Sequence, residues 1–262
     1  MQPLELYIHI PFCVKKCAYC DFLSGPAGEK EKEEYVKMLV DEIRNCPDTV
    51  QNYRVISIFF GGGTPSLLTG EQIGRLMDTV REIFTLDEDA EITMEMNPGT
   101  VTEEKLRKYR QAGVNRLSIG LQSVNDEELR LLGRIHTYEE FREAYHLARA
   151  NGFSNINVDL ISAIPGQTVE SWRRTLEQVM ALSPEHISAY SLILEEGTTF
   201  YKKYVEDEAK EGPKLPDEDA ERQMYWDTET LMEKNGYHRY EISNYAKEGY
   251  ACRHNLGYWE RI

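Results

Sequence analysis

The sequence predicts an α/β fold in which parallel strands form a barrel or a partial barrel. Six short runs of β-branched and apolar residues alternate with amphipathic helical segments, at a spacing of roughly 35 residues. The alternation shows no reversal, which favours a barrel or partial barrel over an open sheet.

The predicted strands cover residues 4–10, 55–60, 91–96, 116–121, 156–161 and 186–194. The segments between them have apolar residues three and four positions apart, as in Tyr35, Met38, Leu39 and Ile43, which is typical of amphipathic helices. Further helices are predicted over residues 102–111, 125–132, 138–151 and 168–182. Several of these open on Thr or Asn, which are good N-cap residues.

The chain is expected to divide near residue 200. Residues 201–219 are charged and contain Gly212, Pro213 and Pro216, a composition typical of an excursion between elements. A long helix is predicted to follow, over about residues 218–235. We therefore expect a barrel over residues 1–200 and a post-barrel segment over 201–262.

Charge and hydropathy exclude some classes of partner. The formal net charge is −15, with 30 basic and 45 acidic side chains, so phosphate backbones should be repelled and no nucleic-acid partner is expected. No basic and apolar leader precedes the first strand, and no run of about 18 apolar residues follows. We expect a cytoplasmic protein that does not span a membrane.

Three of the five cysteines fall within eight residues, directly after the first strand. Structural zinc is an alternative, but it usually needs four ligands in two pairs, and no second pair is present. Thiolates on a short loop also suit an iron-sulfur cluster. The C-x3-C-x2-C spacing of Cys13, Cys17 and Cys20 resembles the radical S-adenosylmethionine (SAM) signature, in which three ligands leave one iron of a [4Fe-4S] cluster open for SAM.

Other polar or glycine positions are predicted at the same rim, because the functional residues of parallel barrels follow the carboxyl ends of the strands. Gly61, Gly62 and Gly63 follow the second strand, where missing Cβ atoms permit a close approach to a ligand. Glu95, Gln122 and Asp159 are polar residues inside apolar strands and would be costly to bury without a partner. Asp159 could accept hydrogen bonds from ribose hydroxyls, and Arg134 could bind a carboxylate.

A cluster of His254, Tyr258 and Trp259 lies near the end of the sequence. Together these residues could supply an axial ligand and a flat apolar face for a porphyrin. The spacing alone is weak evidence, since a loop histidine is more often simply hydrogen-bonded.

Several motifs together resemble the radical SAM heme chaperones, also known as oxygen-independent coproporphyrinogen-III-oxidase-like proteins. The motifs are YIHIPFC at residues 7–13, GGGTPS at 61–66, NPG at 97–99, RLSIGLQ at 116–122, GRIH at 133–136 and HNLGYW at 254–259. The resemblance covers essentially the whole chain.

The resemblance implies a partial (β/α)6 TIM-like barrel of the radical SAM type, with a [4Fe-4S] cluster on Cys13, Cys17 and Cys20. It implies SAM contacts at Tyr7, Tyr19, Gly62, Gly63, Thr64, Glu95, Gln122, Arg134, Asp159 and Ile193. It also implies heme binding, with His254 as a candidate ligand, delivery of heme to recipient hemoproteins, and an electron donor for the cluster.

Two departures separate this sequence from the related oxidase. Phe22 stands where the oxidase carries a fourth cysteine, and only a few residues precede the first strand. We therefore interpret the chain as a heme chaperone rather than an enzyme. The alternative is an oxygen-independent coproporphyrinogen III oxidase that uses a deoxyadenosyl radical to decarboxylate propionate side chains. Because the family usually continues past Trp259, residues 201–262 are expected to include the start of a truncated C-terminal region.

Overall fold

The computed structural model describes residues 1–207 and 211–262. One sheet dominates it, with strands in the order β1-β2-β3-β4-β5-β6-β8-β7. The strands are β1 (Gln2–Ile10), β2 (Tyr53–Gly62), β3 (Thr85–Met96), β4 (Arg116–Gln122), β5 (Ile156–Ser162), β6 (His186–Ser191), β7 (His238–Arg239) and β8 (Asn244–Ala246). Strands β1 to β6 are parallel and follow chain order. The prediction of a parallel α/β sheet is confirmed.

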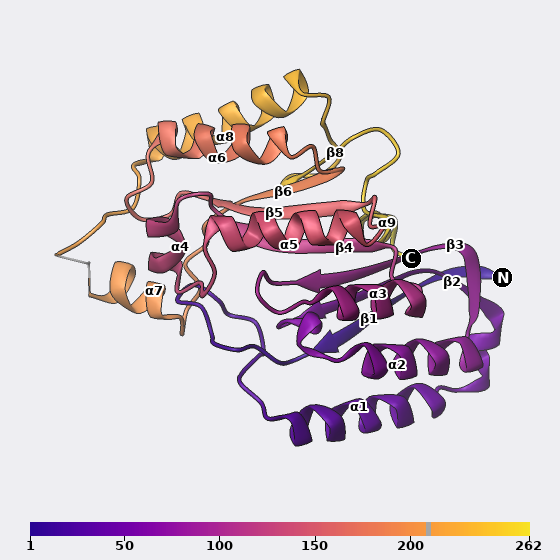
Figure 1. The fold of residues 1–262 in the computed structure, drawn as a ribbon. Coiled ribbons are helices and arrows are strands. Elements are labelled where there is room, and N and C mark those ends of the chain that lie inside the picture. Colours follow the sequence, from indigo (N-terminus) through magenta and orange to yellow (C-terminus); the bar gives the residue numbers. More distant parts are fainter. Residues whose placement is uncertain (208–210) are drawn as a thin grey trace.

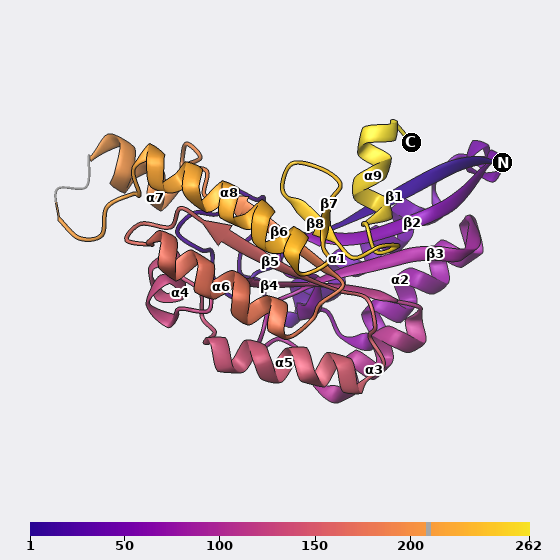
Figure 2. The same ribbon diagram turned by 90° about the horizontal axis from the view of Figure 1, so that it is seen from above.

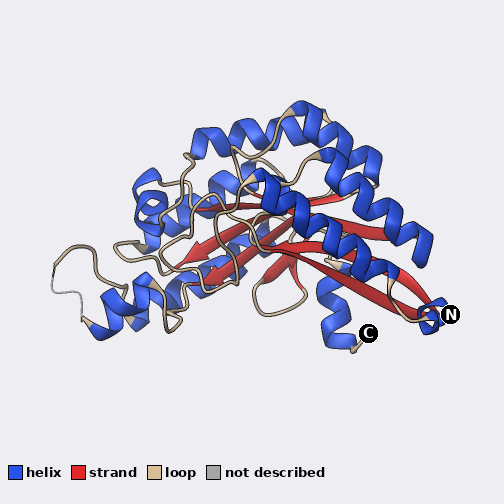
Figure 3. Cartoon of the chain, turned by 90° about the horizontal axis from the view of Figure 1, so that it is seen from below, coloured by secondary structure: helices blue, strands red, loops and turns tan. Residues whose placement is uncertain are grey.

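The helices lie mainly on one face of this sheet, as Figures 1 and 2 show. They are α1 (Glu29–Arg44), α2 (Gly70–Ile83), α3 (Glu103–Ala112), α4 (Asp126–Leu132), α5 (Tyr138–Ala150), α6 (Val169–Ala181), α7 (Thr199–Tyr201), α8 (Glu218–Lys234) and α9 (Arg253–Glu260). Helix α9 is the exception: it crosses the opposite face, over β1 and β2 (Figures 2 and 3). In the described part of the chain no helix is both long and apolar enough to cross a membrane.

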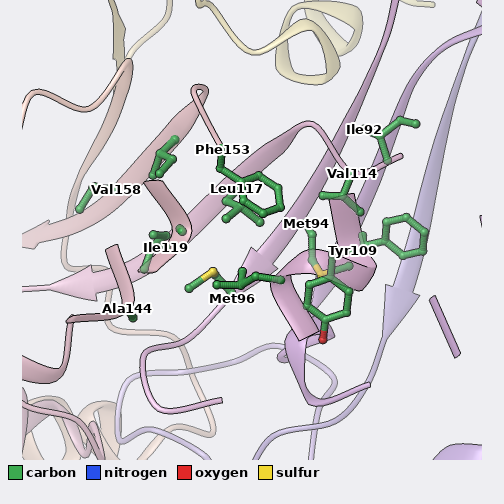
Figure 4. Packing of buried hydrophobic residues seen from close by; sticks show 14 of the residues in the cluster. Ile92, Met94, Met96, Tyr109, Val114, Leu117, Ile119, Ala144, Phe153 and Val158 are labelled. Carbon is green, nitrogen blue, oxygen red and sulfur yellow. The ribbon is translucent and has the colours of Figure 1, made fainter. Parts of the chain in front are cut away.

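The sheet has two chemically different faces. On the helix side of β3 and β4, Ile92, Met94, Leu117 and Ile119 are buried in the hydrophobic core (Figure 4). The alternate positions are polar, including Glu91, Thr93, Glu95, Arg116 and Ser118. Because side chains alternate across a strand, these polar groups all point to the other face, which is the interior of the curved sheet.

Two features of the sheet differ from the sequence-based expectation. Strand β6 ends at Ser191 and not at residue 194, because its partner β5 ends at Ser162, which pairs with Ser191. The post-barrel segment also contributes strands: β8 pairs antiparallel with β6, and β7 pairs with β8. Part of residues 201–262 therefore belongs to the same sheet, and the division near residue 200 stays a prediction.

Candidate functional site

A cavity of about 590 Å³ lies at the carboxyl ends of the parallel strands. Its lining includes most of the residues predicted for the site: Cys13, Cys17, Tyr19, Cys20, Gly62, Gly63, Thr64, Glu95, Gln122, Arg134, Asp159 and Ile193. These residues come from loops and strand ends that lie far apart in the sequence. The register of the parallel strands brings them together, as expected for a barrel rim.

The loop with the three cysteines is held by backbone hydrogen bonds on both sides. Cys13 N donates to Gly25 O at 2.9 Å, and Ala18 N donates to Leu132 O at 2.9 Å. Phe200 N in turn donates to Ala18 O at 2.9 Å. The loop is thereby fixed to the end of α4 and to α7, which places its thiols at one wall of the cavity.

All three thiols are free and half-buried. Thr64 Oγ1 lies 3.6 Å from Cys13 Sγ, and Arg134 Nη1 lies 3.9 Å from Cys17 Sγ. Burial raises the pKa of Cys20, as do the neighbouring thiols, so a cationic metal centre would favour the thiolate form of Cys20. Across the described residues, no three His, Cys, Asp or Glu side chains are placed to hold a single metal ion.

The glycine loop after β2 supports the cysteine loop. Gly63 N donates to Ile10 O at 2.9 Å, Thr64 N to Phe12 O at 2.7 Å, and Gly62 N to Glu95 Oε2 at 3.1 Å. Gly62 has φ +111°, a conformation that other residues rarely adopt. These three backbone N–H groups already donate within the protein. An amino group of a ligand would therefore not face free N–H donors at this loop.

Gly63→Ala is expected to weaken the cysteine loop. A Cβ at Gly63 would lie 2.6 Å from Phe12 O and 2.9 Å from Phe12 N, and backbone atoms cannot move aside cheaply. We expect a loss of about 1–3 kcal/mol in the free energy of unfolding, measured with denaturant, as for other overpacked sites. Gly74→Ala is the control, because its Cβ would meet no atom within 4 Å in the middle of α2 and should stabilise the protein. Equal stability of Gly63→Ala and wild type would contradict the packing argument.

Two carboxyl groups face the cavity. Asp159 Oδ2 accepts from Ser118 Oγ at 2.9 Å, and Asp159 Oδ1 accepts from Asn157 Nδ2 at 2.7 Å. Burial raises the pKa of Glu95 to about 8, and repulsion from Asp159 adds to this. Burial also raises the pKa of Asp159. Two carboxyl groups whose charge is poorly compensated are typical of a site that binds a cation or hydroxyl donors.

Arg134 spans the floor between the cysteines and the strand ends. Its Nη2 donates to Asn97 Oδ1 and to Gly120 O, both at 2.6 Å, while its buried Nε has no partner in the described part of the chain. Asn97 also donates to Thr64 Oγ1 at 2.8 Å. Gln122 lies nearby with φ +78°, an unusual conformation for a residue other than glycine.

The predicted aromatic and apolar contacts lie in different places. Tyr19 lines the cavity, and burial raises the pKa of its hydroxyl. Ile193 lines it from the loop after β6 and is largely exposed. Tyr7 is not part of the lining: its ring stacks on Phe59, with centroids 6.1 Å apart.

His254 lies apart from the cavity, on α9. Its side chain is buried, its Nδ1 lies 2.9 Å from Ser57 Oγ, and its ring stacks on Phe59. Burial lowers the pKa of His254 to about 4, so the ring is neutral. The structure places His254 beside Tyr7, with ring centroids 6.3 Å apart, and apart from the predicted site residues that line the cavity.

Three residues at the site were not among the predicted contacts, although the sequence marks them. Asn97, which joins Thr64 to Arg134, opens the NPG motif at the end of β3. Ser118 and Asn157, which hold Asp159, are polar residues at inward positions of apolar strands. The signal that marked Glu95 and Asp159, a polar residue inside an apolar strand, could have found them.

Comparison with known proteins agrees with this geometry. Residues 7–179 match the radical SAM superfamily. The heme chaperone HemW of Escherichia coli (strain K12) is 45% identical over 260 residues, which cover 99% of this chain and 67% of that protein. This chain belongs to the HemW family of radical SAM proteins. The heme chaperone HemW of Bacillus subtilis (strain 168) is 39% identical, over 97% of this chain and 66% of its own length.

A solved structure similar to this HemW-family chain is the coproporphyrinogen III oxidase HemN from Escherichia coli, described as a radical SAM enzyme. The two superpose with a TM-score of 0.84 at 32% identity, over 95% of this chain and 56% of HemN. The partial-barrel fold of the radical SAM type is confirmed. The chain spans about two thirds of the length of the HemW proteins and little more than half of HemN.

Radical SAM proteins use a [4Fe-4S] cluster and SAM, and the residues at the cavity of this HemW-family chain fit both groups. Three thiols share one wall, which suits a cluster with one open iron. Glu95 and Asp159 offer acceptors for amino and hydroxyl groups, and Arg134 offers a guanidinium at the cavity lining.

Proposed function

We propose that this chain is a radical SAM heme chaperone, which binds a [4Fe-4S] cluster, SAM and heme and delivers heme to target hemoproteins. The observation that carries the proposal is the 45% identity to the Escherichia coli heme chaperone HemW over 99% of the chain, together with the three-thiol loop at the cavity. Function on a radical SAM fold has to be argued from the site, because the same fold supports both chaperones and oxidases.

The proposed ligands of the cluster are Cys13, Cys17 and Cys20. When bound, such a cluster supplies an electron and an iron with an open coordination position. Arg134 Nη1, 3.9 Å from Cys17 Sγ, would stabilise negative charge on that sulfur. Lys16, which favours the charged form of Cys20, would act in the same sense. The electron has to come from a donor protein or small reductant outside the chain.

SAM is proposed to fill the remainder of the cavity. Ionised Glu95 would accept hydrogen bonds from the methionyl amino group, and Asp159 from the ribose hydroxyls. Arg134, whose guanidinium lines the cavity, would bind the methionyl carboxylate. The other proposed contacts in the lining are Tyr19, Gly62, Gly63, Thr64, Gln122 and Ile193. Tyr7 is also proposed as a contact, although it lies outside the lining.

Heme binding is proposed on the basis of the HemW relatives, with His254 as the candidate ligand. Both ring nitrogens of His254 are engaged, Nδ1 with Ser57 Oγ at 2.9 Å and Nε2 with the Tyr258 hydroxyl at 3.5 Å. A role as an iron ligand therefore requires helix α9 to lift from the sheet and release the imidazole. Tyr258 and Trp259, which are largely exposed on the same helix, would provide apolar area for the porphyrin.

The alternative function is oxygen-independent coproporphyrinogen III oxidation, and the structural similarity to HemN favours it. The sequence departs from that enzyme at Phe22, which replaces its fourth cysteine and is 66% exposed at the rim of the cavity. The HemW relatives, which match along nearly the whole chain, favour the chaperone.

A paired assay separates the two functions. Protein reconstituted under nitrogen is titrated with heme, and is then incubated with coproporphyrinogen III, SAM and a reductant. We expect a stable heme complex and no decarboxylated product. His254→Ala should weaken heme binding at least about 10-fold, as loss of an axial ligand would. His146→Ala, which removes an exposed histidine on α5, should leave it unchanged. Decarboxylated product, or the absence of any heme complex, would refute the chaperone.

A further inference from the structure

A chain of hydrogen bonds runs through the interior of the sheet from the cavity to helix α9. It starts at Asp159 Oδ1, which lies 2.7 Å from Asn157 Nδ2. Asn157 Oδ1 lies 2.6 Å from His186 Nδ1, and His186 Nε2 lies 2.8 Å from the Tyr240 hydroxyl. Asn255 Nδ2, on α9, donates to the same hydroxyl at 3.2 Å.

Every hydrogen bond in this series is donated in the direction of Asp159. The carboxylate accepts from the amide nitrogen of Asn157, so the amide oxygen of Asn157 faces His186 and must accept from His186 Nδ1–H. In a neutral ring Nε2 is then the acceptor, and it receives the proton of the Tyr240 hydroxyl. His186 is neutral because burial, followed by the nearby charge of Arg116, lowers its pKa well below the ordinary value. Hydrogen bonds aligned in this way strengthen one another.

Asp159, at the cavity end of this series of hydrogen bonds, has acceptor positions left for a ligand. Each of its oxygens accepts one hydrogen bond from the protein, from Ser118 and from Asn157. The hydroxyl of Ser188, which donates to Asn157 Oδ1 at 3.1 Å, also lies against the carboxylate. A carboxylate can accept about four, so two positions are left. The side chain is half-buried and lines the cavity. Two free acceptor positions on one carboxylate match the two neighbouring hydroxyls of a ribose.

The other end of this series of hydrogen bonds lies in helix α9, which is held by polar contacts and by the stacking of His254 on Phe59. The carboxylate of Glu91 on β3 accepts from Arg253 N at 3.1 Å and 3.2 Å, which caps the start of α9. Gly257 packs against the side chain of Glu5 on β1. Asn255 adds its bond to Tyr240, so a shift of α9 would change the last link of the chain.

We propose that this series of hydrogen bonds links binding of the nucleoside ribose at Asp159 to the docking of α9, with Asn157, His186 and Tyr240 as positioning residues. The inference rests on the proposed function, in which SAM occupies the cavity and α9 carries the heme motif. Linkage is reciprocal: if SAM favours the docked helix, the docked helix favours SAM by the same factor.

Tyr240→Phe tests the proposal, because it removes the hydroxyl that joins His186 to Asn255. We expect SAM to bind about 5-fold more weakly to the variant, as for the loss of one buried hydrogen bond, in equilibrium dialysis with anaerobically reconstituted protein. Tyr237→Phe is the matched control: this buried tyrosine donates to Pro184 O at 2.7 Å and lies outside the chain. Asn255→Ala removes the last hydrogen bond of the series, between α9 and Tyr240. It should have an effect similar to that of Tyr240→Phe.

The second readout is amide hydrogen exchange of residues 253–260 with and without SAM. In the wild type and in Tyr237→Phe, SAM should slow this exchange, and in Tyr240→Phe and Asn255→Ala the slowing should disappear. If SAM does not alter exchange in the wild type, or if both chain variants bind SAM like the wild type, the linkage is overturned while the proposed cluster and SAM sites stand. Failure of the wild type to bind SAM would overturn the proposed function and this inference with it.

Discussion

Replacing Cys17 with Ala is expected to abolish assembly of the iron-sulfur cluster and to leave the barrel folded. Among the described residues three thiols line the cavity, and we expect a [4Fe-4S] cluster left with two protein ligands to be lost. Cys17 lies in a half-buried loop and is not part of the hydrophobic core, which the helices and strands form. Iron and sulfide analysis after anaerobic reconstitution should therefore show near-complete loss of the cluster, and thermal unfolding of the unreconstituted proteins should show similar midpoints.

Cys46→Ala is the matched control, since Cys46 is a half-buried free thiol at the end of α1. It should take up the same amount of iron as the wild type. Full iron content in Cys17→Ala would mean that the loop is not the cluster site. Unfolding of Cys17→Ala would show instead that the thiol has a structural role.

Glu95→Gln should have opposite effects on stability and on ligand binding. The pKa of Glu95 is raised from its ordinary value of 4.5 to about 8, chiefly by burial. Below pH 4.5 the carboxyl is protonated in both the folded and the unfolded protein, and the substitution changes little. Between pH 4.5 and 8 the unfolded state ionises first, so the wild type loses stability as pH rises; above pH 8 the penalty is constant. The variant should therefore be more stable at pH 9, by about 1–3 kcal/mol, and nearly equal at pH 4.5.

The same substitution should greatly weaken SAM binding. A neutral amide cannot compensate the positive charge of the amino group, and a loss of at least about 10-fold is expected for a charge-assisted hydrogen bond. Denaturant unfolding of the ligand-free protein at pH 4.5 and pH 9, together with SAM dialysis, measures both effects. Glu127→Gln, at an exposed position on α4, is a suitable control. A variant that is less stable than the wild type at pH 9 would contradict the raised pKa.

Long elements with a clear period could be predicted from the sequence. The β-branched and apolar runs in residues 91–96 and 116–121 predicted nearly all of β4 but only the second half of β3, whose start at Thr85 was missed. The three residues of β8 and the two of β7 are too short to show any period. They form strands through tertiary pairing, β8 with the free edge of β6 and β7 with β8.

The candidate site was predictable to the extent that it depends on strand ends. Glu95 and Asp159 were placed at one rim because the carboxyl ends of parallel strands meet there, and both line the cavity. The position of His254 was not predictable in this way. It depends on where α9 crosses the sheet, which is set by contacts such as those of Glu91 with the start of the helix. The links from Asn157 to Tyr240 also depend on tertiary structure, since His186 and Tyr240 are 54 residues apart.

Helix α9 packs on strands that lie almost 200 residues earlier in the sequence and are synthesised before it. Ser57 and His254, for example, are 197 positions apart. Each parallel strand pairs with the next one made, so the sheet can assemble in sequence order before its cover arrives. Before α9 docks, Glu5 and Glu91 are hydrated. Undocking of α9 therefore exposes carboxyl groups to water and leaves no cavity in the hydrophobic core. We therefore expect this helix to detach before the sheet melts, which gives large flat molecules a way into the interior without unfolding of the barrel.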